Sequence, residues 1–386
     1  MKKYLLMGLV AICLCIVASA CNSRNNMNYS TRTKFPWVPN VSAPLNYPAG
    51  VKYAYLGFGN EGRRYPVMSS FADAGIGVNK GEVSFADLES DEGLDIPNSL
   101  EILWLSYAEG KLYKAHTKFS QELQNKILAL LREGYNTEYG NEKLKHETYS
   151  SFLITMLPGG KVWLYMEGAA RYVLVCDTIQ AEPTEMTLGD FDKEALRVAS
   201  TVQEYSKGCL EKKQIENLKV NGIPYGLWDK YRERFNYDIK FEFEDKNSKI
   251  DSLSVVYDFI NGEFNYASDG VKAGALSRPK QLHLEWNVKG TIYTGEFFFD
   301  EHEVLDIFSK AFSINRRNEK GSLCIKVSKY NNKFDISLHL NDKKIPFSKT
   351  KIHVFKQYAD QSDLDAIIIY NNHQEIHSDD IKFIGE

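Results

Sequence analysis

The sequence is poor in cysteine, which limits how the chain can be stabilised. It has six cysteines in 386 residues, and Cys13 and Cys15 fall in an N-terminal leader. The three that follow residue 21, Cys176, Cys209 and Cys324, allow at most one internal disulfide, and their spacings match no zinc motif. We therefore do not expect a disulfide framework to be the source of stability.

The sequence also lacks, near its start, an apolar run long enough to anchor the chain across a membrane. The run at residues 4–17 is too short for this, follows Lys2 and Lys3, and ends in small residues. This pattern predicts a signal peptide at residues 1–20. Cys21 resembles the lipobox cysteine of bacterial lipoproteins, which implies lipidation at Cys21. Because Ala18 stands where leucine is most common, a plain secreted protein is the alternative.

Charge of one sign is not concentrated anywhere in the chain. Cleavage after residue 20 removes two lysines and no acid, so the formal charge moves from −4 to −6. Acidic and basic residues are interspersed, which argues against nucleic-acid partners. No P-loop sequence and no G-x-S-x-G elbow occur, and no acidic cluster follows Cys21. We expect an outer-membrane lipoprotein facing the periplasm, with the cell surface as the second location.

What the sequence does contain is a stretch that occurs twice. Residues 97–132 and 279–312 share proline, leucine and tryptophan at offsets of zero, three and seven. Each copy continues with a tyrosine, a phenylalanine six residues later and a helix N-cap. The matched residues are Pro97, Leu100, Trp104, Tyr113, Phe119 and Ser120 in the first copy, and Pro279, Leu282, Trp286, Tyr293, Phe299 and Asp300 in the second. The segment between Trp and Tyr differs by two residues, as in a surface turn.

The repeat predicts two related domains. Each copy reads as strand, strand, helix, hairpin and a further strand, and we expect an α+β fold with two tandem domains, each a mainly antiparallel sheet packed by one principal helix. The expected divisions are a tether at 21–46, a first repeat at 47–188, a helical connector at 189–220 and a second repeat at 221–386. The connector should pack through Ala195, Val198, Val202 and Tyr205.

Finer assignments follow from alternation and turn residues. Residues 51–56 and 239–243 read as corresponding strands of the two copies. Hairpins are expected at 152–166 and 323–340, closed by third strands at 172–176 and 352–355. Period-two counting places Trp104 and Trp286 on the buried face of their strands, which favours a core role over a sugar-stacking platform.

A resemblance to a known family rests on two motifs. One is Ile96-Pro97 followed by Leu100, Ile102, Trp104, Ser106, Glu109 and Tyr113, and the other is Trp228, Lys230, Tyr231, Arg232, Arg234 and Phe235. Together they resemble an uncharacterised family of Gram-negative lipoproteins that is catalogued as a domain of unknown function. The resemblance implies secretion and lipid anchoring, with no established activity. Some such lipoproteins lie beside toxin-secretion genes, which suggests an immunity role by analogy.

Several patterns suggest chemistry, and each has a structural alternative that we favour. Residues 57–62 match G-x-G-x-x-G, but Pro66 opposes the helix that a nucleotide site needs, so we expect a loop and no nucleotide. His373 and His377 are four residues apart and could bind a metal on a helix, yet a solvated tail fits better. His283 and Glu285 share a strand face as a candidate acid–base pair, but an exposed face is the better interpretation.

The remaining candidate is a cationic and aromatic cluster. Trp228, Lys230, Arg232 and Arg234 could form a partner-binding surface, although a segment joining two domains is the simpler reading. The sequence predicts no cofactor, no metal site and no catalytic residue. We expect a non-catalytic binding module for a protein or glycan in the envelope. The alternatives are a periplasmic immunity protein that neutralises a secreted toxin, and an envelope hydrolase with a site between the repeats.

Overall fold

The computed structural model describes residues 29–60, 62–79, 93–138, 144–313, 316–341, 343–358, 366–373 and 383–386. The chain divides into two compact units. The N-terminal unit holds the described residues up to Tyr135, residues 145–227 and residues 384–386. The C-terminal unit holds Trp228–Phe383 and the described residues of Asn136–Leu144. The expected signal peptide and Cys21 lie outside the described residues.

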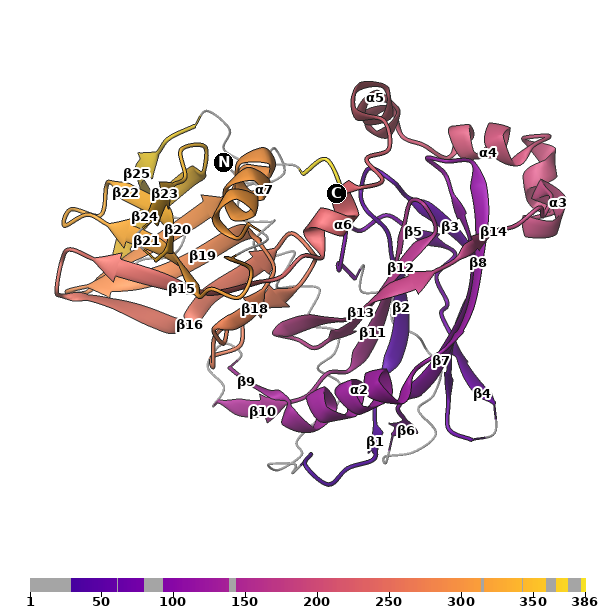
Figure 1. Ribbon diagram of the computed structural model, residues 1–386, viewed down its shortest axis with the longest axis horizontal. Helices are drawn as coiled ribbons and strands as arrows, with labels where there is room; N and C mark the ends of the chain where they lie inside the picture. Colours follow the sequence, from indigo (N-terminus) through magenta and orange to yellow (C-terminus); the bar gives the residue numbers. More distant parts are fainter. Residues whose placement is uncertain are drawn as a thin grey trace. The chain divides into compact units, whose positions relative to one another are not determined.

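The N-terminal unit is built on two sheets (Figure 1). The first has the order β2-β11-β12-β13, with β2 (Val38–Ser42), β11 (Ser151–Leu157), β12 (Lys161–Glu167) and β13 (Arg171–Gln180). The second has the order β14-β8-β7-β3-β4, with β14 (Glu182–Pro183), β8 (Lys111–Lys118), β7 (Pro97–Ser106), β3 (Ala49–Phe58) and β4 (Arg63–Pro66), and with β5 (Phe71–Ala72) paired to β3. Shorter strands are β1 (Lys34–Phe35), β6 (Leu94–Asp95), β9 (Tyr135–Thr137) and β10 (Lys145–Glu147).

The C-terminal unit also has two sheets (Figure 1, orange to yellow). One has the order β18-β15-β21-β22-β23. Its strands are β18 (Gly274–Leu276), β15 (Phe235–Phe243), β21 (Gly321–Val327), β22 (Phe334–Leu340) and β23 (Lys343–Pro346). The other has the order β17-β16-β19-β20-β24-β25, with β17 (Phe264–Asn265), β16 (Ser248–Phe259), β19 (Pro279–Val288), β20 (Thr291–Phe298), β24 (Lys351–Tyr358) and β25 (Ile367–Asn371).

The two units repeat one strand order. In both, a parallel pair (β2 with β11, β15 with β21) continues into an antiparallel hairpin. In both, the strand that starts with the repeated proline lies between two antiparallel partners, β3 and β8 for β7, and β16 and β20 for β19. Trp104 pairs with Tyr113, and Trp286 pairs with Tyr293. The correspondence in strand order matches the repeat in the sequence.

The repeated side chains lie in the interior, as their alternation predicts. Trp104 and Trp286 are fully buried, and each stacks on its paired tyrosine, with ring centroids 5.4 and 5.5 Å apart. Aromatic residues also join the two sheets of each unit. Trp37, which precedes β2, contacts Phe58 of β3 at 5.8 Å. In the C-terminal unit Phe243 of β15 contacts Trp286 of β19 at 5.7 Å. Each unit is therefore two sheets packed through an aromatic core.

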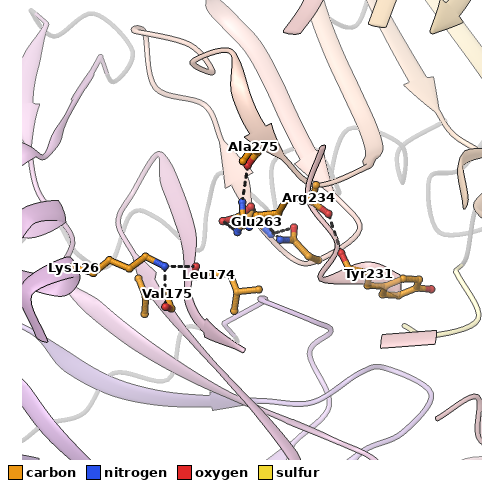
Figure 2. Close-up of polar contacts among 9 residues, drawn as sticks. Lys126, Leu174, Val175, Tyr231, Arg234, Glu263 and Ala275 are labelled. Atoms are coloured by element: carbon orange, nitrogen blue, oxygen red, sulfur yellow. Dashed lines mark hydrogen bonds and ion pairs between the residues drawn. The ribbon is translucent and has the colours of Figure 1, made fainter. Parts of the chain in front are cut away.

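One longer helix follows the repeated strands in each unit. Ser120 caps α2 (Gln121–Glu133) by accepting from the Leu123 N–H, and Asp300 caps α7 (Glu301–Ala311) by accepting from the Glu303 N–H. These caps satisfy backbone donors that a helix start leaves unpaired. Lys126 of α2 donates to the Val175 carbonyl of β13 at 2.9 Å, which ties the helix to the sheet (Figure 2).

The expected α+β class is wrong. Strands make up 47% and helices 17% of the described residues, so the fold is mainly β, with several multi-stranded sheets. The expected helical connector at 189–220 is instead a series of short helices, α3 (Leu188–Phe191), the 3-10 turn η2 (Glu194–Arg197), α4 (Val202–Gly208) and α5 (Lys212–Asn221). A further short helix, α6 (Leu227–Tyr231), follows beyond these bounds. The pattern misled because short edge strands carry too few residues to show alternation, and because caps interrupt the helical periodicity.

Four further assignments differ from expectation. Val198 is 75% exposed, because the chain leaves the helical turn at Val198 and the next helix begins only after Thr201. The third strand of the second hairpin is β23, whereas β24 pairs with β20. The counterpart of β3 is β16 and not β15, because each flanks the proline-initiated strand. Residues 38–42, expected in the tether, form β2. Among the helices of the described ranges, none is long and apolar enough to cross a membrane.

Candidate functional site

A cavity of about 410 Å³ opens in the N-terminal unit beside the turn between β7 and β8. It is lined by the turn, by α4 and α5, and by Leu210 between these two helices. The lining residues are Tyr107, Ala108, Glu109, Gly110, Gln203, Ser206, Lys207, Leu210, Ile215, Leu218 and Lys219. Its size lies within the range of small-ligand and side-chain pockets.

The turn that forms one wall is fixed by its sequence and by packing. Gly110 adopts a φ of 60°, which favours glycine, and its N–H donates to the Ser106 carbonyl at 2.9 Å. Tyr107 is buried in an apolar cluster with Leu105 and Leu112. Gly50 of β3 lies against the Tyr107 ring, where a side chain would clash with it. The wall is therefore an ordered part of the sheet.

The helices that form the other wall also follow from local sequence. Thr201 caps α4 by accepting from the Glu204 N–H, and Val202 and Tyr205 pack on the cluster that contains Tyr107. Gln214 of α5 accepts from the Glu211 N–H at 2.8 Å and donates to the Leu45 carbonyl at 2.7 Å. This buried amide fixes α5 to the loop after β2.

Glu109, at the tip of the turn, is held by three donors. Its Oε1 accepts from the hydroxyls of Tyr113 at 2.8 Å and Tyr225 at 3.0 Å, and its Oε2 accepts from the Gly159 N–H at 3.1 Å. The carboxylate thus joins the β7–β8 turn, the β11–β12 turn and the segment before α6. Both of its oxygens are already bound, so its role here is to hold the wall in place.

The tyrosines around the cavity stay protonated at neutral pH. Burial, followed by the Glu109 charge, raises the pKa of Tyr225 to about 12. Burial and then the hydrogen bond to Glu109 raise the pKa of Tyr113 above its usual range. Burial also raises the pKa of Tyr107, and the Ser206 hydroxyl donates to the Val202 carbonyl at 2.7 Å. These hydroxyls therefore provide neither a base nor an activated nucleophile.

A second feature of the N-terminal unit is the buried acid Glu167 at the end of β12. Its side chain is 3% exposed, Oε2 accepts from the Asn79 amide at 3.1 Å, and Oε1 has no hydrogen-bond partner. Burial raises the pKa of Glu167 to about 7, against the opposing effect of hydrogen bonds from Ser151 and Asn79. No sequence pattern pointed to this residue, because an acid at a strand end usually reaches water.

The C-terminal unit places histidines and an acid in a row across three strands. His283 lies opposite Glu296, and Glu296 lies opposite His353. His353 Nδ1 is 3.6 Å from Glu296 Oε2, and the His353 ring stacks on His373 with centroids 4.3 Å apart. Sequence reasoning paired His283 with Glu285 along one strand, whereas the acid directly opposite it comes from the neighbouring strand.

The described part of the histidine row offers no third metal ligand beside its histidines and Glu296. No group of three or more His, Cys, Asp or Glu side chains in the described ranges is placed to hold a metal ion. Burial, followed by the nearby His353 and Lys351, lowers the pKa of His373. His377, the expected partner of His373, lies outside the described residues.

The four residues of the expected binding cluster differ in burial and in their partners. Trp228 is fully buried in the C-terminal unit. Arg234 donates to Glu263 at 2.7 Å and to the Ala275 carbonyl at 3.1 Å, as Figure 2 shows. Arg232 lies 3.6 Å from Asp229, and the Lys230 carbonyl accepts from Arg278. A binding role for this segment stays a prediction. The indole of Trp228 does not reach the surface.

Other sequence candidates have structural roles. The first glycines of the G-x-G-x-x-G match end β3, and β4 follows as the second strand of a hairpin, so no helix begins there. Cys176, Cys209 and Cys324 are free thiols. The cavity was missed because the two extra residues between Trp104 and Tyr113 were interpreted as an ordinary surface turn. The signal that could have found it is that same difference between the two copies.

Comparison with known families agrees with the motifs in the first half of the chain. The model of the family described as Protein of unknown function (DUF2931) matches residues 22–226, which is more than half of the chain and close to the extent of the N-terminal unit. Searches of curated proteins and of solved structures gave no match. The chain therefore belongs to the DUF2931 family of proteins of unknown function.

Proposed function

We propose that the protein is a non-catalytic binding module that holds a partner protein at the cavity of its N-terminal unit. The observation that carries the proposal is the origin of this cavity. Residues 107–110, the turn that departs from the repeated pattern, form one of its walls, whereas the matching turn of the C-terminal unit is only Lys289 and Gly290. A departure from a repeated scaffold at a surface turn is where a binding site is expected.

Exposed apolar side chains on and beside α5 support a macromolecular partner. Val220 is 82% exposed, Tyr225 is 46% exposed and Leu45 is 44% exposed. Gln214 holds the Leu45 backbone against α5, and Tyr225 bonds to Glu109 of the cavity wall. None of the three lines the cavity, so they add exposed apolar surface to the elements that form its walls, and such surface is typical of protein contact sites.

The tryptophans favour a protein partner over a glycan. Sugar-binding surfaces rely on exposed aromatic faces. All five tryptophans, at positions 37, 104, 163, 228 and 286, are at most 1% exposed. The indoles are therefore committed to the interior, and the exposed apolar groups near the cavity are mostly aliphatic.

The chemistry of the lining supports binding without catalysis. Glu109 is saturated by its three donors, the nearby tyrosines keep raised pKa values, and the Ser206 hydroxyl is bound to backbone. A hydrolytic site needs a nucleophile within reach of a free base. The described lining residues offer no such pair.

Site-specific crosslinking tests this function. A photo-crosslinking amino acid at Val220 should give one discrete adduct in living cells, because this side chain is exposed on α5 and follows Lys219 of the cavity lining. The same amino acid at Tyr330, which is 76% exposed on the C-terminal unit, is the matched control. Equal adducts at both positions, or none at Val220 in cells that carry the native gene neighbourhood, would contradict the proposal.

We also propose that the module is presented on a lipid anchor. The basic and apolar leader, the small residues before Cys21 and the family match from residue 22 onward support this. The missing acidic cluster after Cys21 favours an outer-membrane anchor that faces the periplasm. Labelling with a fatty-acid analogue should mark the wild-type chain and not the Cys21→Ser variant. An equally labelled variant would refute the anchor.

A further inference from the structure

The lysines of the cavity helices fall into two groups. Lys207 of α4 and Lys219 of α5 line the cavity and are exposed, and the side chain of neither forms an ion pair or a hydrogen bond with a described residue. Lys212 and Lys213, at the start of α5, do not line it and are paired, with Glu216 at 3.9 Å and Glu211 at 3.1 Å. Among the lysines of α4 and α5, the two that line the cavity are thus the two without an ion-pair partner.

The lining between these cations is apolar. Leu210, Ile215 and Leu218 contribute side chains to it, and each is half-buried. The acidic member of the lining, Glu109, is engaged by Tyr113, Tyr225 and Gly159 and pairs with neither lysine. An occupant that is apolar in its body and negatively charged at its flank would use both properties of the site.

We infer that the cavity binds an acidic segment of a partner protein, an inference that rests on the binding function proposed above. One large apolar side chain of this segment enters the cavity, and the carboxylates of the segment lie against Lys207 and Lys219. A protein rather than a free fatty acid follows from the exposed surface beyond the cavity. Val220 and Tyr225 offer contact area that one alkyl chain inside the cavity does not use.

Two dyes with the same aromatic body test the charge preference. Anilinonaphthalene sulfonate carries one negative charge, and N-phenylnaphthylamine carries none. The chain without its leader and without Cys21, residues 22–386, should bind the sulfonate more tightly than the neutral dye at low salt, and added salt should reduce the difference. The Lys207→Gln/Lys219→Gln variant should weaken sulfonate binding about fivefold and leave the neutral dye unchanged.

The matched control is the Lys212→Gln/Lys213→Gln variant, which removes the same amount of charge, in this case from the start of α5 alone. It should change sulfonate binding by less than about twofold, because these lysines are paired away from the cavity. If it weakens binding as much as the cavity variant does, or if the neutral dye binds as tightly as the sulfonate, the inference is wrong. In the second case the cavity binds an apolar group without a charge preference.

Displacement of the bound dye by competing ligands shows whether the acidic occupant of the cavity is a peptide or a fatty acid. A capped peptide with one tryptophan between two pairs of aspartates should displace the sulfonate dye, and the same peptide with asparagines should not. Dodecanoate displacing the dye more strongly than the acidic peptide would overturn the protein assignment in favour of a lipid. If neither dye binds and Val220 gives no crosslink, the proposed function itself fails, which separates the two outcomes.

Discussion

The N-terminal and C-terminal units have the same strand order, but the turns that join the two strands of their central hairpins differ in length. In the C-terminal unit β19 turns into β20 through Lys289 and Gly290, with φ angles of 52° and 91°. In the N-terminal unit β7 turns into β8 through residues 107–110, and this longer turn lines the cavity. The stacked tryptophan–tyrosine pair directly below is alike in both. The comparison teaches that the residues repeated in both units build the interior, whereas the residues of the longer turn, which are not repeated, line the cavity.

The family match also distinguishes the two units. It covers residues 22–226 and stops near the end of the N-terminal unit. The short helices α3, α4 and α5, which have no counterpart in the strand order of the C-terminal unit, also lie within it. The part of the chain that carries the cavity is therefore the part that defines the family.

The sharpest test makes the first turn as short as the second. Deleting Ala108 and Glu109 leaves Tyr107 and Gly110 as a two-residue turn and removes part of the cavity wall. We expect sulfonate-dye binding to fall below detection, because the lining is broken. Dye titration measures this, and circular dichroism checks that the strands persist. Unchanged binding would show that the turn is not part of the site.

The paired tryptophans test whether the two interiors are equivalent in energy. Trp104→Ala and Trp286→Ala should each lower the free energy of unfolding of their own unit by about 3 to 5 kcal/mol, because each removes a fully buried indole. Urea unfolding, followed with a reporter in each unit, measures the two values. A loss below about 1 kcal/mol in one unit would show that its interior repacks and that the equivalence is only geometric.

Glu167 should make the stability of the N-terminal unit depend on pH. At the matching end of β22 the C-terminal unit has the apolar Leu340. The pKa of Glu167 is raised from 4.5 to about 7, so the folded state holds the proton more tightly than the unfolded state. Stability is therefore greatest below pH 4.5 and falls as the pH rises to about 7, by about 3 kcal/mol in all.

Urea unfolding of the wild type and of Glu167→Gln between pH 4.5 and pH 8 measures this loss. The variant should remove most of the decline, because the amide does not ionise. The control is Glu182→Gln, at an exposed position of β14, which should leave the decline intact. A wild-type stability that rises over this range would contradict the assignment.

Removing the Glu109 side chain should give a smaller difference in stability between the two turns. Glu109→Ala leaves the Tyr113 hydroxyl and the Gly159 N–H without their acceptor, and should cost about 2 kcal/mol of unfolding free energy. Lys289→Ala in the matching turn should cost less than about 0.5 kcal/mol, because a surface side chain there has few partners to lose. Equal costs would mean that the Glu109 bonds do not stabilise the longer turn.

The smallest expected effect is a pH dependence of opposite sign in the C-terminal unit. Burial and the neighbouring His353 and Lys351 lower the pKa of His373 below 6.5, so the unfolded state takes up its proton first as the pH falls. The C-terminal unit should therefore lose stability below about pH 6.5, where the Glu167 effect stabilises the N-terminal unit. His373→Gln should reduce this acid sensitivity, as measured by unfolding at pH 7 and pH 5.5. No change would exclude His373 as its source.

Much of the interior could be predicted from the sequence. The strands that start at Pro97 and Pro279, the inward face of Trp104 and Trp286, and the caps at Ser120 and Asp300 are local properties. They follow from alternation over neighbouring residues and from a side chain that bonds a backbone N–H three positions ahead. A pattern that occurs twice also predicted a repeated strand order.

The class of fold and the site could not be predicted in this way. Short strands such as β4, β14 and β23 exist because a longer neighbour pairs with them, so their own few residues carry no signal. Glu285 seemed the natural partner of His283, but the acid opposite it comes from another strand.

The sequence by itself determined which residues face the core and where the two helices α2 and α7 begin, because those choices depend on near neighbours. Only the tertiary structure decided that Glu109, Tyr225 and Gly159 meet, and that α4 and α5 complete a cavity against the β7–β8 turn. The physical reason is distance along the chain: Glu109 and Tyr225 lie 116 residues apart, and no local pattern encodes a contact that only the folded sheet brings together.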